Sequence, residues 1–229
     1  MTSSSHIYFV LDRSGSMCDF VDDTIGGFKT FVKGQQTDNP NGVMSLFLFN
    51  DKLTPVYKNK PIKEVEMLDS SKYSPCGTTA LCDAIGSTIK FADSDDHHQT
   101  IIVILTDGED NTSTKYTRHH INDLIDMKKK NGWQFVFLAA NQDAIKVANQ
   151  YGICQDSALT FNQGHTEDTF ECLSAAVGRQ VTGESQNVEF TGLERMKSCP
   201  RPEYASMATV SSEVFTGVVH DSVSGLQRH

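Results

Sequence analysis

The stretch that decides the fold reads YFVLDRSGSMCDF and spans residues 8–20. Its first four residues are apolar and continue a run that begins at His6, which has the length and composition of a buried β-strand. The run passes directly into Asp12, Ser14 and Ser16, so an acid and two hydroxyls stand on alternating positions at the carboxyl end of the expected strand. Three chemical roles are open to such a group: nucleophilic attack, capping of the next helix, and coordination of a metal ion.

Strand-like and helix-like segments alternate along the rest of the chain. Apolar runs of strand length occupy residues 6–11, 43–49, 53–57, 100–105, 133–139 and 158–161. Helical spacing of apolar residues is found over 18–33, around 81–89, from Thr117 to the lysines at 128–130, and over 142–151 and 166–181. This order predicts an α/β fold with three layers: a doubly wound, Rossmann-like, mostly parallel sheet with one antiparallel edge strand, and helices on both faces.

The length of the chain and its change in composition suggest one domain and a tail. The chain has 229 residues, enough to bury a substantial core. We expect the packed domain over residues 1–182 and a polar C-terminal extension over residues 183–229, which is rich in serine and contains two prolines. Within the extension, residues 210–219 have the composition of a further strand.

Charge and cysteine content narrow the classes of partner. Lys and Arg together number 20 against 29 Asp plus Glu, a formal net charge of -9, so neither nucleic acid nor an anionic membrane is expected as a partner. No export signal and no apolar run of membrane-spanning length is recognisable. The six cysteines are scattered without a C-x-x-C pair. We therefore expect a cytoplasmic protein with reduced thiols.

The polar residues at the strand ends form a candidate metal site. In an open α/β sheet, ligands gather at the carboxyl ends of the strands. Asp12, Ser14 and Ser16 follow the first strand, Asp107 follows the strand 100–105, and Thr78 precedes the helix between them. Two carboxylates and three hydroxyls are hard oxygen donors suited to Mg2+, and the two carboxylates balance its charge.

Three separated pieces of sequence resemble a known family. The pieces are Asp12-Arg13-Ser14-Gly15-Ser16-Met17, Gly77-Thr78 and Thr106-Asp107-Gly108. Together they resemble the von Willebrand factor A family and its metal-ion-dependent adhesion site. The resemblance covers residues 6–181 and is closest to intracellular bacterial or phage members. One departure is Cys76, which stands where the family usually has a second glycine.

This resemblance implies a role for each site residue. Ser14 and Ser16 would bind Mg2+ directly, Thr78 directly or through water, and Asp12 and Asp107 mostly through water, with Mn2+ or Ca2+ as alternative ions. One coordination position would remain for an Asp or Glu carboxylate of a partner protein. The function that the resemblance implies is therefore a Mg2+-dependent protein–protein interaction module.

Enzymatic interpretations fit the sequence poorly. A phosphatase of the haloacid dehalogenase kind needs a second acid two residues after Asp12, and that position is Ser14. Residues 13–17 are not the G-x-S-x-G elbow of a serine hydrolase, and residues 26–30 lack the spacing of a phosphate-binding loop. We predict that the protein is not an enzyme.

Several alternatives stay open at this point. For an isolated D-x-S-x-S stretch, helix capping would be the favoured role, and Thr79 is expected to cap the helix that follows it. The second functional class is a metal-independent structural or assembly protein, such as a phage or host-interaction component. The sequence also leaves open whether the extension supplies an acid of its own to the metal, from Glu184, Glu189 or Glu194.

Overall fold

A sheet of six strands forms the centre of the computed structural model, which describes residues 5–95, 99–140 and 143–200. In spatial order it runs β3-β2-β1-β4-β5-β6. The strands are β1 (Ser5–Asp12), β2 (Val43–Phe49), β3 (Leu53–Pro61), β4 (Gln99–Thr106), β5 (Gln134–Ala140) and β6 (Ala158–Phe161). Every neighbouring pair is parallel except β2 and β3. The predicted fold class, with its antiparallel edge strand, is confirmed.

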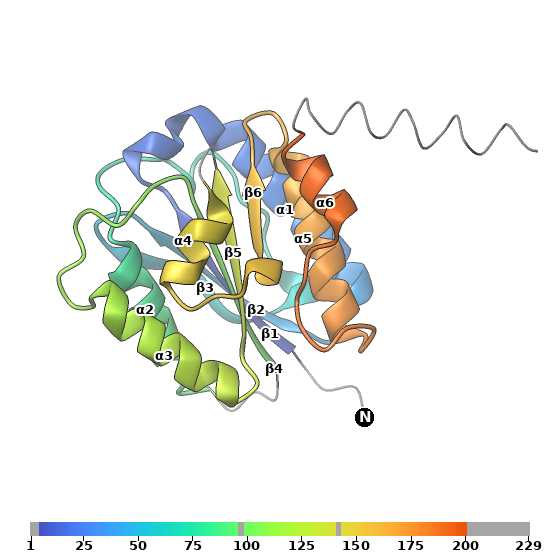
Figure 1. Ribbon diagram of the computed structural model, residues 1–229. Helices are drawn as coiled ribbons and strands as arrows, with labels where there is room; N and C mark the ends of the chain where they lie inside the picture. Colours follow the sequence, from blue (N-terminus) through green and yellow to red (C-terminus); the bar gives the residue numbers. More distant parts are fainter. Residues whose placement is uncertain (1–4, 96–98, 141–142, 201–229) are drawn as a thin grey trace, which may run out of the picture. The chain divides into compact units, whose positions relative to one another are not determined.

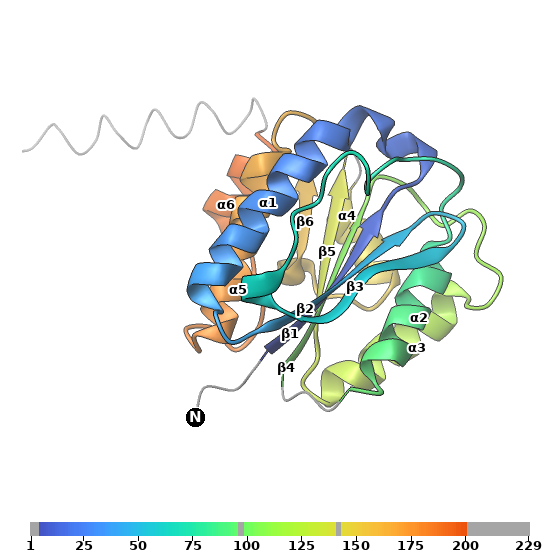
Figure 2. The same ribbon diagram turned by 180° about the vertical axis from the view of Figure 1, so that it is seen from behind.

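Helices cover both faces of this sheet (Figures 1 and 2). One face carries α1 (Val21–Asp38), α5 (Thr166–Val181) and α6 (Gly192–Ser198), and the other carries α2 (Leu81–Ala92), α3 (Arg118–Lys130) and α4 (Ala144–Gln150). Side chains of β1 alternate between the two cores: Phe9 packs on the side of α1 and α5, and Val10 on the side of α2 and α3. The sheet is therefore buried on both faces, as its continuous apolar strands predict.

The two central strands, β1 and β4, meet where the strand order reverses. From β1 the sheet extends through β2 to β3 on one side, and from β4 through β5 to β6 on the other. Leu11 pairs in register with Leu105, so the chain leaves both strands at the same edge of the sheet. Such a switch point is where α/β sheets bind ligands.

The first helix begins later than its apolar spacing predicts. A 3-10 helix, η1 (Gly15–Phe20), leaves the loop after β1, and α1 starts only at Val21. The backbone N–H of Met17 donates to the carbonyl of Ser14 at 3.1 Å, which gives this turn the tighter 3-10 geometry. At its far end α1 continues to Asp38, just before the turn that contains Pro40.

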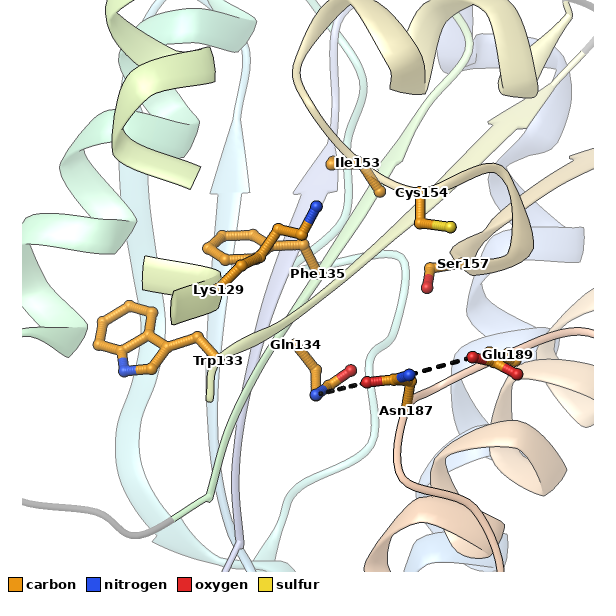
Figure 3. A pocket seen from close by; sticks show the side chains of 9 residues that line it. All are labelled: Lys129, Trp133, Gln134, Phe135, Ile153, Cys154, Ser157, Asn187 and Glu189. Carbon is orange, nitrogen blue, oxygen red and sulfur yellow. Dashed lines mark hydrogen bonds between the residues drawn. The ribbon is translucent and has the colours of Figure 1, made fainter. Parts of the chain in front are cut away.

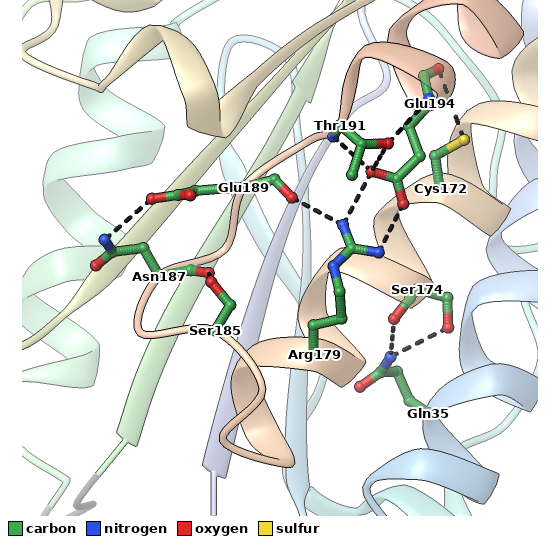
Figure 4. Close-up of polar contacts among 9 residues, drawn as sticks. All are labelled: Gln35, Cys172, Ser174, Arg179, Ser185, Asn187, Glu189, Thr191 and Glu194. Carbon is green, nitrogen blue, oxygen red and sulfur yellow. Dashed lines mark hydrogen bonds and ion pairs between the residues drawn. The ribbon is translucent and has the colours of Figure 1, made fainter.

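The compact unit extends past residue 182, the boundary expected from composition, to Cys199. Val188 and Phe190 are buried in the core beside α1 and α5. The Arg179 guanidinium of α5 donates to both carboxylate oxygens of Glu194, at 2.8 and 2.9 Å (Figure 4). Two apolar side chains and one ion pair thus fasten a segment whose composition is otherwise polar. Residues 210–219, the expected further strand, lie outside the described residues.

Two shorter findings complete the fold. All six cysteines are free thiols, as expected. In the described ranges, no helix is long and apolar enough to cross a membrane.

Candidate functional site

Asp12 is the last residue of β1 and is completely buried. Its Oδ1 accepts a hydrogen bond from the backbone N–H of Ser14, and its Oδ2 accepts one from the Thr106 hydroxyl, both at 2.6 Å. The Tyr73 hydroxyl donates to the Asp12 carbonyl at 2.7 Å. Asp12 is therefore held from three directions, and both of its carboxylate oxygens are occupied.

A line of hydrogen bonds joins the loop after β1 to the loop after β4. The Ser14 and Ser16 hydroxyl oxygens lie 3.1 Å apart, and the Ser16 hydroxyl donates to Oδ1 of Asp107 at 2.8 Å. Ser14 is buried, whereas Ser16 is exposed and Asp107 is partly exposed. The structure thus brings together four of the five predicted ligands and leaves their outer end open to solvent.

The fifth predicted ligand, Thr78, is exposed on a neighbouring loop. The N–H of Gly15 donates to the carbonyl of Gly77 at 3.1 Å, and the N–H of Cys76 donates to the carbonyl of Arg13 at 2.8 Å. Gly77 has a φ of +79°, a conformation that favours glycine, and it turns the chain at this point. The loop that carries Thr78 is therefore fastened directly against the Asp-x-Ser-x-Ser loop.

The expectation that Thr79 caps the next helix is wrong. The N-cap of α2 is Ala80, with no side-chain capping bond, and Thr79 is buried. Its backbone N–H donates to the Asn111 side-chain oxygen, and its carbonyl accepts from the Asn111 N–H, both at 3.0 Å. A methyl group added at Gly108 would lie 3.7 Å from Oγ1 of Thr79 and 3.9 Å from Oγ of Ser16. The Thr79 hydroxyl therefore lies on the same rim as Ser16.

Burial shapes the electrostatics of this rim. It raises the pKa of Asp12 to about 6, although the hydrogen bonds from Thr106 and Ser14 act in the opposite direction. It also raises the pKa of Asp107, against the hydrogen bond from Ser16. In the part of the chain that the structure describes, neither carboxylate forms an ion pair with a basic side chain. A bound cation would offset both charges.

The donor set of the rim suits a hard cation. Among the described residues, no three His, Cys, Asp or Glu side chains converge on one point as a metal-binding group. The rim offers oxygen atoms of another kind, because two carboxylates are combined with the hydroxyls of Ser14, Ser16 and the Thr78–Thr79 pair. Oxygen donors of this kind fit Mg2+ or Ca2+ and not a soft metal.

Three residues that support the site were missed by the sequence reasoning. Thr106 and Tyr73 hold Asp12. The Asn50 side chain donates to the Cys76 carbonyl at 2.9 Å, and the backbone carbonyl of Asn50 accepts from the Ala80 N–H at 2.7 Å. Thr106 directly precedes Asp107, so its position gave a signal. Tyr73 and Asn50 lie outside the predicted strands and helices, where the apolar spacing gives no signal.

Comparison with known proteins identifies the family. Residues 6–214 match the sequence profile of the von Willebrand factor type A (VWA) domain. The chain belongs to the VWA family. A search of curated proteins found no match. The resemblance to the family, seen in three short motif pieces, is thus confirmed over most of the chain, while the metal-ion-dependent adhesion site and the bacterial or phage origin stay predictions.

Solved VWA structures share the fold at low sequence identity. The VWA domain of the type V pilus tip protein Mfa5 from Porphyromonas gingivalis superposes with a TM-score of 0.61 at 9% identity, covering 79% of this chain and 97% of that one. The minor pilin PilB from Streptococcus sanguinis gives 0.55 at 12%, covering 81% and 64%. The ArnB paralogue VWA2 from Sulfolobus acidocaldarius gives 0.53 at 16%, covering 76% and 45%. At these identities the likeness shows the fold alone.

A separate cavity lies at the opposite end of the sheet, beside the first residue of β5 (Figure 3). Its volume is about 290 Å³. The Gln134 amide donates to the Asn187 side-chain oxygen at 3.4 Å, and the Asn187 amide donates to Glu189 at 3.1 Å. None of the five predicted metal ligands lines this cavity, but Glu189, one of the acids considered for the metal, does.

Proposed function

We propose that this VWA domain binds Mg2+ at the rim of the sheet and, through the ion, an Asp or Glu carboxylate of a partner protein. VWA domains typically act as protein-interaction modules. Asp12, Ser14, Ser16 and Asp107 would hold the ion together with Thr78, and Thr79 is the alternative hydroxyl donor. The observation that carries the proposal is the Ser14–Ser16–Asp107 line of hydrogen bonds, which joins oxygen donors from both central strands beside a buried acid.

The chain's own residues prepare this site before any ion arrives. Because both Asp12 oxygens already accept hydrogen bonds, Asp12 is better placed to act at a distance than as a direct ligand. The exposed Ser16 and Thr78 side chains stand at the solvent side, where a partner can approach. Bound Mg2+ would supply the charge that offsets the two carboxylates and one coordination position for the partner's acid.

We further propose binding and not catalysis. A nucleophilic carboxylate must reach its substrate, and Asp12 is completely buried with both oxygens occupied. The Ser14 hydroxyl is hydrogen-bonded to the Ser16 hydroxyl. Among the described residues, no hydrogen bond joins Ser14 to a histidine that could act as a base. The rim therefore has the donors of a binding site without an arranged nucleophile and base.

The proposal is tested by capturing partner proteins from a lysate on immobilised wild-type chain. We expect at least one protein to be retained in Mg2+ and released by EDTA, and to be absent from a column of the Asp12→Asn variant. Asp123→Asn, which changes an exposed acid of α3, is the matched control and should retain the partner. A partner that stays bound in EDTA and on Asp12→Asn would instead support the metal-independent assembly class.

A further inference from the structure

Arg13 stands between two predicted ligands but extends away from them. Its backbone N–H donates to the carbonyl of Phe49, the last residue of β2, at 2.7 Å. Its side chain continues over the end of β2, and Nη2 donates to Oγ1 of Thr54 in β3 at 3.1 Å. The guanidinium is thus attached to β3, two strands away from β1, on the same edge of the sheet as the rim.

Most of the donors of this guanidinium are unused. Arginine carries five N–H donors, is always charged, and fits a carboxylate with two parallel hydrogen bonds. Its Nε is buried and has no acceptor among the described residues. No ion pair joins Arg13 to an acid within those residues either. A carboxylate that arrives from outside would meet the Nη donors, because Nε is buried.

The acids nearest in sequence are directed elsewhere. Asp12 binds Thr106 and the Ser14 N–H. Asp51, in the turn between β2 and β3, lies beside Gly77, where an added methyl group would be 3.4 Å from Asp51 Oδ1. The next residue, Lys52, is exposed and also lacks an ion pair in the described part of the chain. Lys52 in this turn and Arg13 beside it are therefore two cations that form no ion pair with an acid of the described residues.

There is open space beside this turn. A cavity of about 440 Å³ lies between the turn and α2, and its lining includes Lys52, Leu53, Ala80 and Lys115. Two acids, Asp51 and Asp83, also line it; the Asp83 carboxylate accepts backbone N–H bonds from residues 114–116. A peptide that crosses the rim can continue over this side of the domain.

We propose that Arg13 binds a second carboxylate of the partner segment whose first carboxylate binds the metal, an inference that rests on the proposed function. Two strand spacings separate β1 from β3, about 10 Å, and an extended peptide advances about 3.3 Å per residue. The second acid therefore stands about two or three residues from the first. The metal alone then does not determine specificity for acidic segments, because Arg13 contributes to it.

The test uses immobilised synthetic peptides of Gly and Ser that carry one Asp, and the same peptides with a Glu at successive distances on either side of it. Retention of the full-length chain is measured in Mg2+ and in EDTA. We expect retention in Mg2+ to be roughly twofold to fivefold stronger with a second acid two or three residues away, the size of one partly exposed charged pair. In Arg13→Gln this advantage disappears, while Arg13→Lys restores part of it.

Two controls separate the possible failures. Mg2+ affinity, measured by calorimetry, should be unchanged in Arg13→Gln, and Lys63→Gln, which removes an exposed charge beyond the far end of β3, should leave the peptide preference intact. Retention that depends on Mg2+ can be accompanied by an unchanged preference for a second acid in Arg13→Gln, or by no such preference in the wild type. Either result overturns only the role of Arg13. Equal retention or none in Mg2+ and EDTA overturns the proposed function and the role of Arg13 with it.

Discussion

Two groups of buried or partly buried acids in this molecule have opposite surroundings. At the C-terminal segment, burial alone would raise the pKa of Glu194, but hydrogen bonds from Arg179 and Thr191 lower it below its ordinary value (Figure 4). At the rim of the sheet, burial raises the pKa of Asp12 to about 6 and raises that of Asp107, and no basic side chain of the described residues pairs with either. Glu194 has its cation within the chain, whereas the structure describes none for Asp12 or Asp107.

This difference separates acids that stabilise the fold from acids that are available for binding. Glu194 fastens α6 and its preceding segment to α5, so its charge contributes to stability. Asp12 is charged at neutral pH at a cost to the folded state, and a metal ion removes that cost.

Removing Arg179, the cation that pairs with Glu194, should destabilise the protein most. Arg179→Ala leaves Glu194 partly buried without its partner, and we expect the free energy of unfolding to fall by about 3 kcal/mol. Chemical denaturation at pH 7 measures it. Lys146→Ala, an exposed residue of α4, is the control and should change stability by less than about 0.5 kcal/mol. A similarly small effect of Arg179→Ala would show that the ion pair does not fasten the segment.

Removing the negative charge of Asp12 should instead stabilise the metal-free protein. The folded state of the metal-free protein holds a proton on Asp12 up to a pKa of about 6, above the ordinary value of 3.8. The contribution of Asp12 to stability is therefore lost as pH rises from about 4 to about 6, and is constant above that. In Asp12→Asn this loss is absent. We expect the variant to be more stable than wild type above pH 6 by about 2 kcal/mol.

Denaturation of both proteins in EDTA at a series of pH values measures this difference. The shift itself corresponds to about 3 kcal/mol, and the amide forfeits part of that because its oxygen can accept from the Ser14 N–H while its NH2 group cannot accept from Thr106 and must donate to that hydroxyl instead. The difference in free energy of unfolding between Asp12→Asn and the wild type should grow between pH 4 and pH 6. A difference that stays constant over this range would contradict a raised pKa of Asp12.

Adding Mg2+ should offset the charges of Asp12 and Asp107 and so stabilise the folded protein. At ten times its dissociation constant, the ion should raise the free energy of unfolding of the wild type by about 1.4 kcal/mol. Because protonation of Asp12 competes with the ion, this gain should decrease below pH 6. Thermal unfolding with and without Mg2+ measures it, and Ser16→Ala is expected to show no gain at any pH. A gain of equal size in Ser16→Ala would place the ion elsewhere.

The smallest effect concerns the support of Asp12. Tyr73→Phe removes the hydrogen bond to the Asp12 carbonyl, and we expect a loss of about 1 kcal/mol in stability. The matched control is Tyr57→Phe, because the Tyr57 hydroxyl is 3.7 Å from the sulfur of Met44 and should contribute little. If the denaturation curves of Tyr73→Phe and Tyr57→Phe coincide, Tyr73 does not support the site.

The sequence predicted those parts of the fold that depend on local pattern. The six strands and the predicted α5 follow from apolar runs and spacing, because a sheet covered on both faces requires apolar residues at successive positions. Four of the five predicted ligands come together, since residues at the ends of neighbouring parallel strands must lie at one edge.

Features that depend on partners distant in sequence were not predicted. The hydroxyls of Thr106 and Tyr73 reach Asp12 across 94 and 61 residues. Thr106 stands next to a predicted ligand, but nothing local to Tyr73 indicates its contact. The packed segment before α6 depends on two buried apolar residues, Val188 and Phe190, in a stretch whose composition is polar. The position of Thr79 follows from its backbone pairing with Asn111, which helix-capping preferences do not reveal.

The central claim is that the oxygen donors at the sheet edge form one Mg2+ site. Isothermal titration of Mg2+ into the wild type and into Asp12→Asn at pH 7.5 tests it most directly, since the variant is expected to fold at least as well as the wild type. The account predicts one ion bound per wild-type chain and none in the variant. Equal binding by both proteins, or no binding to the folded wild type, would contradict it.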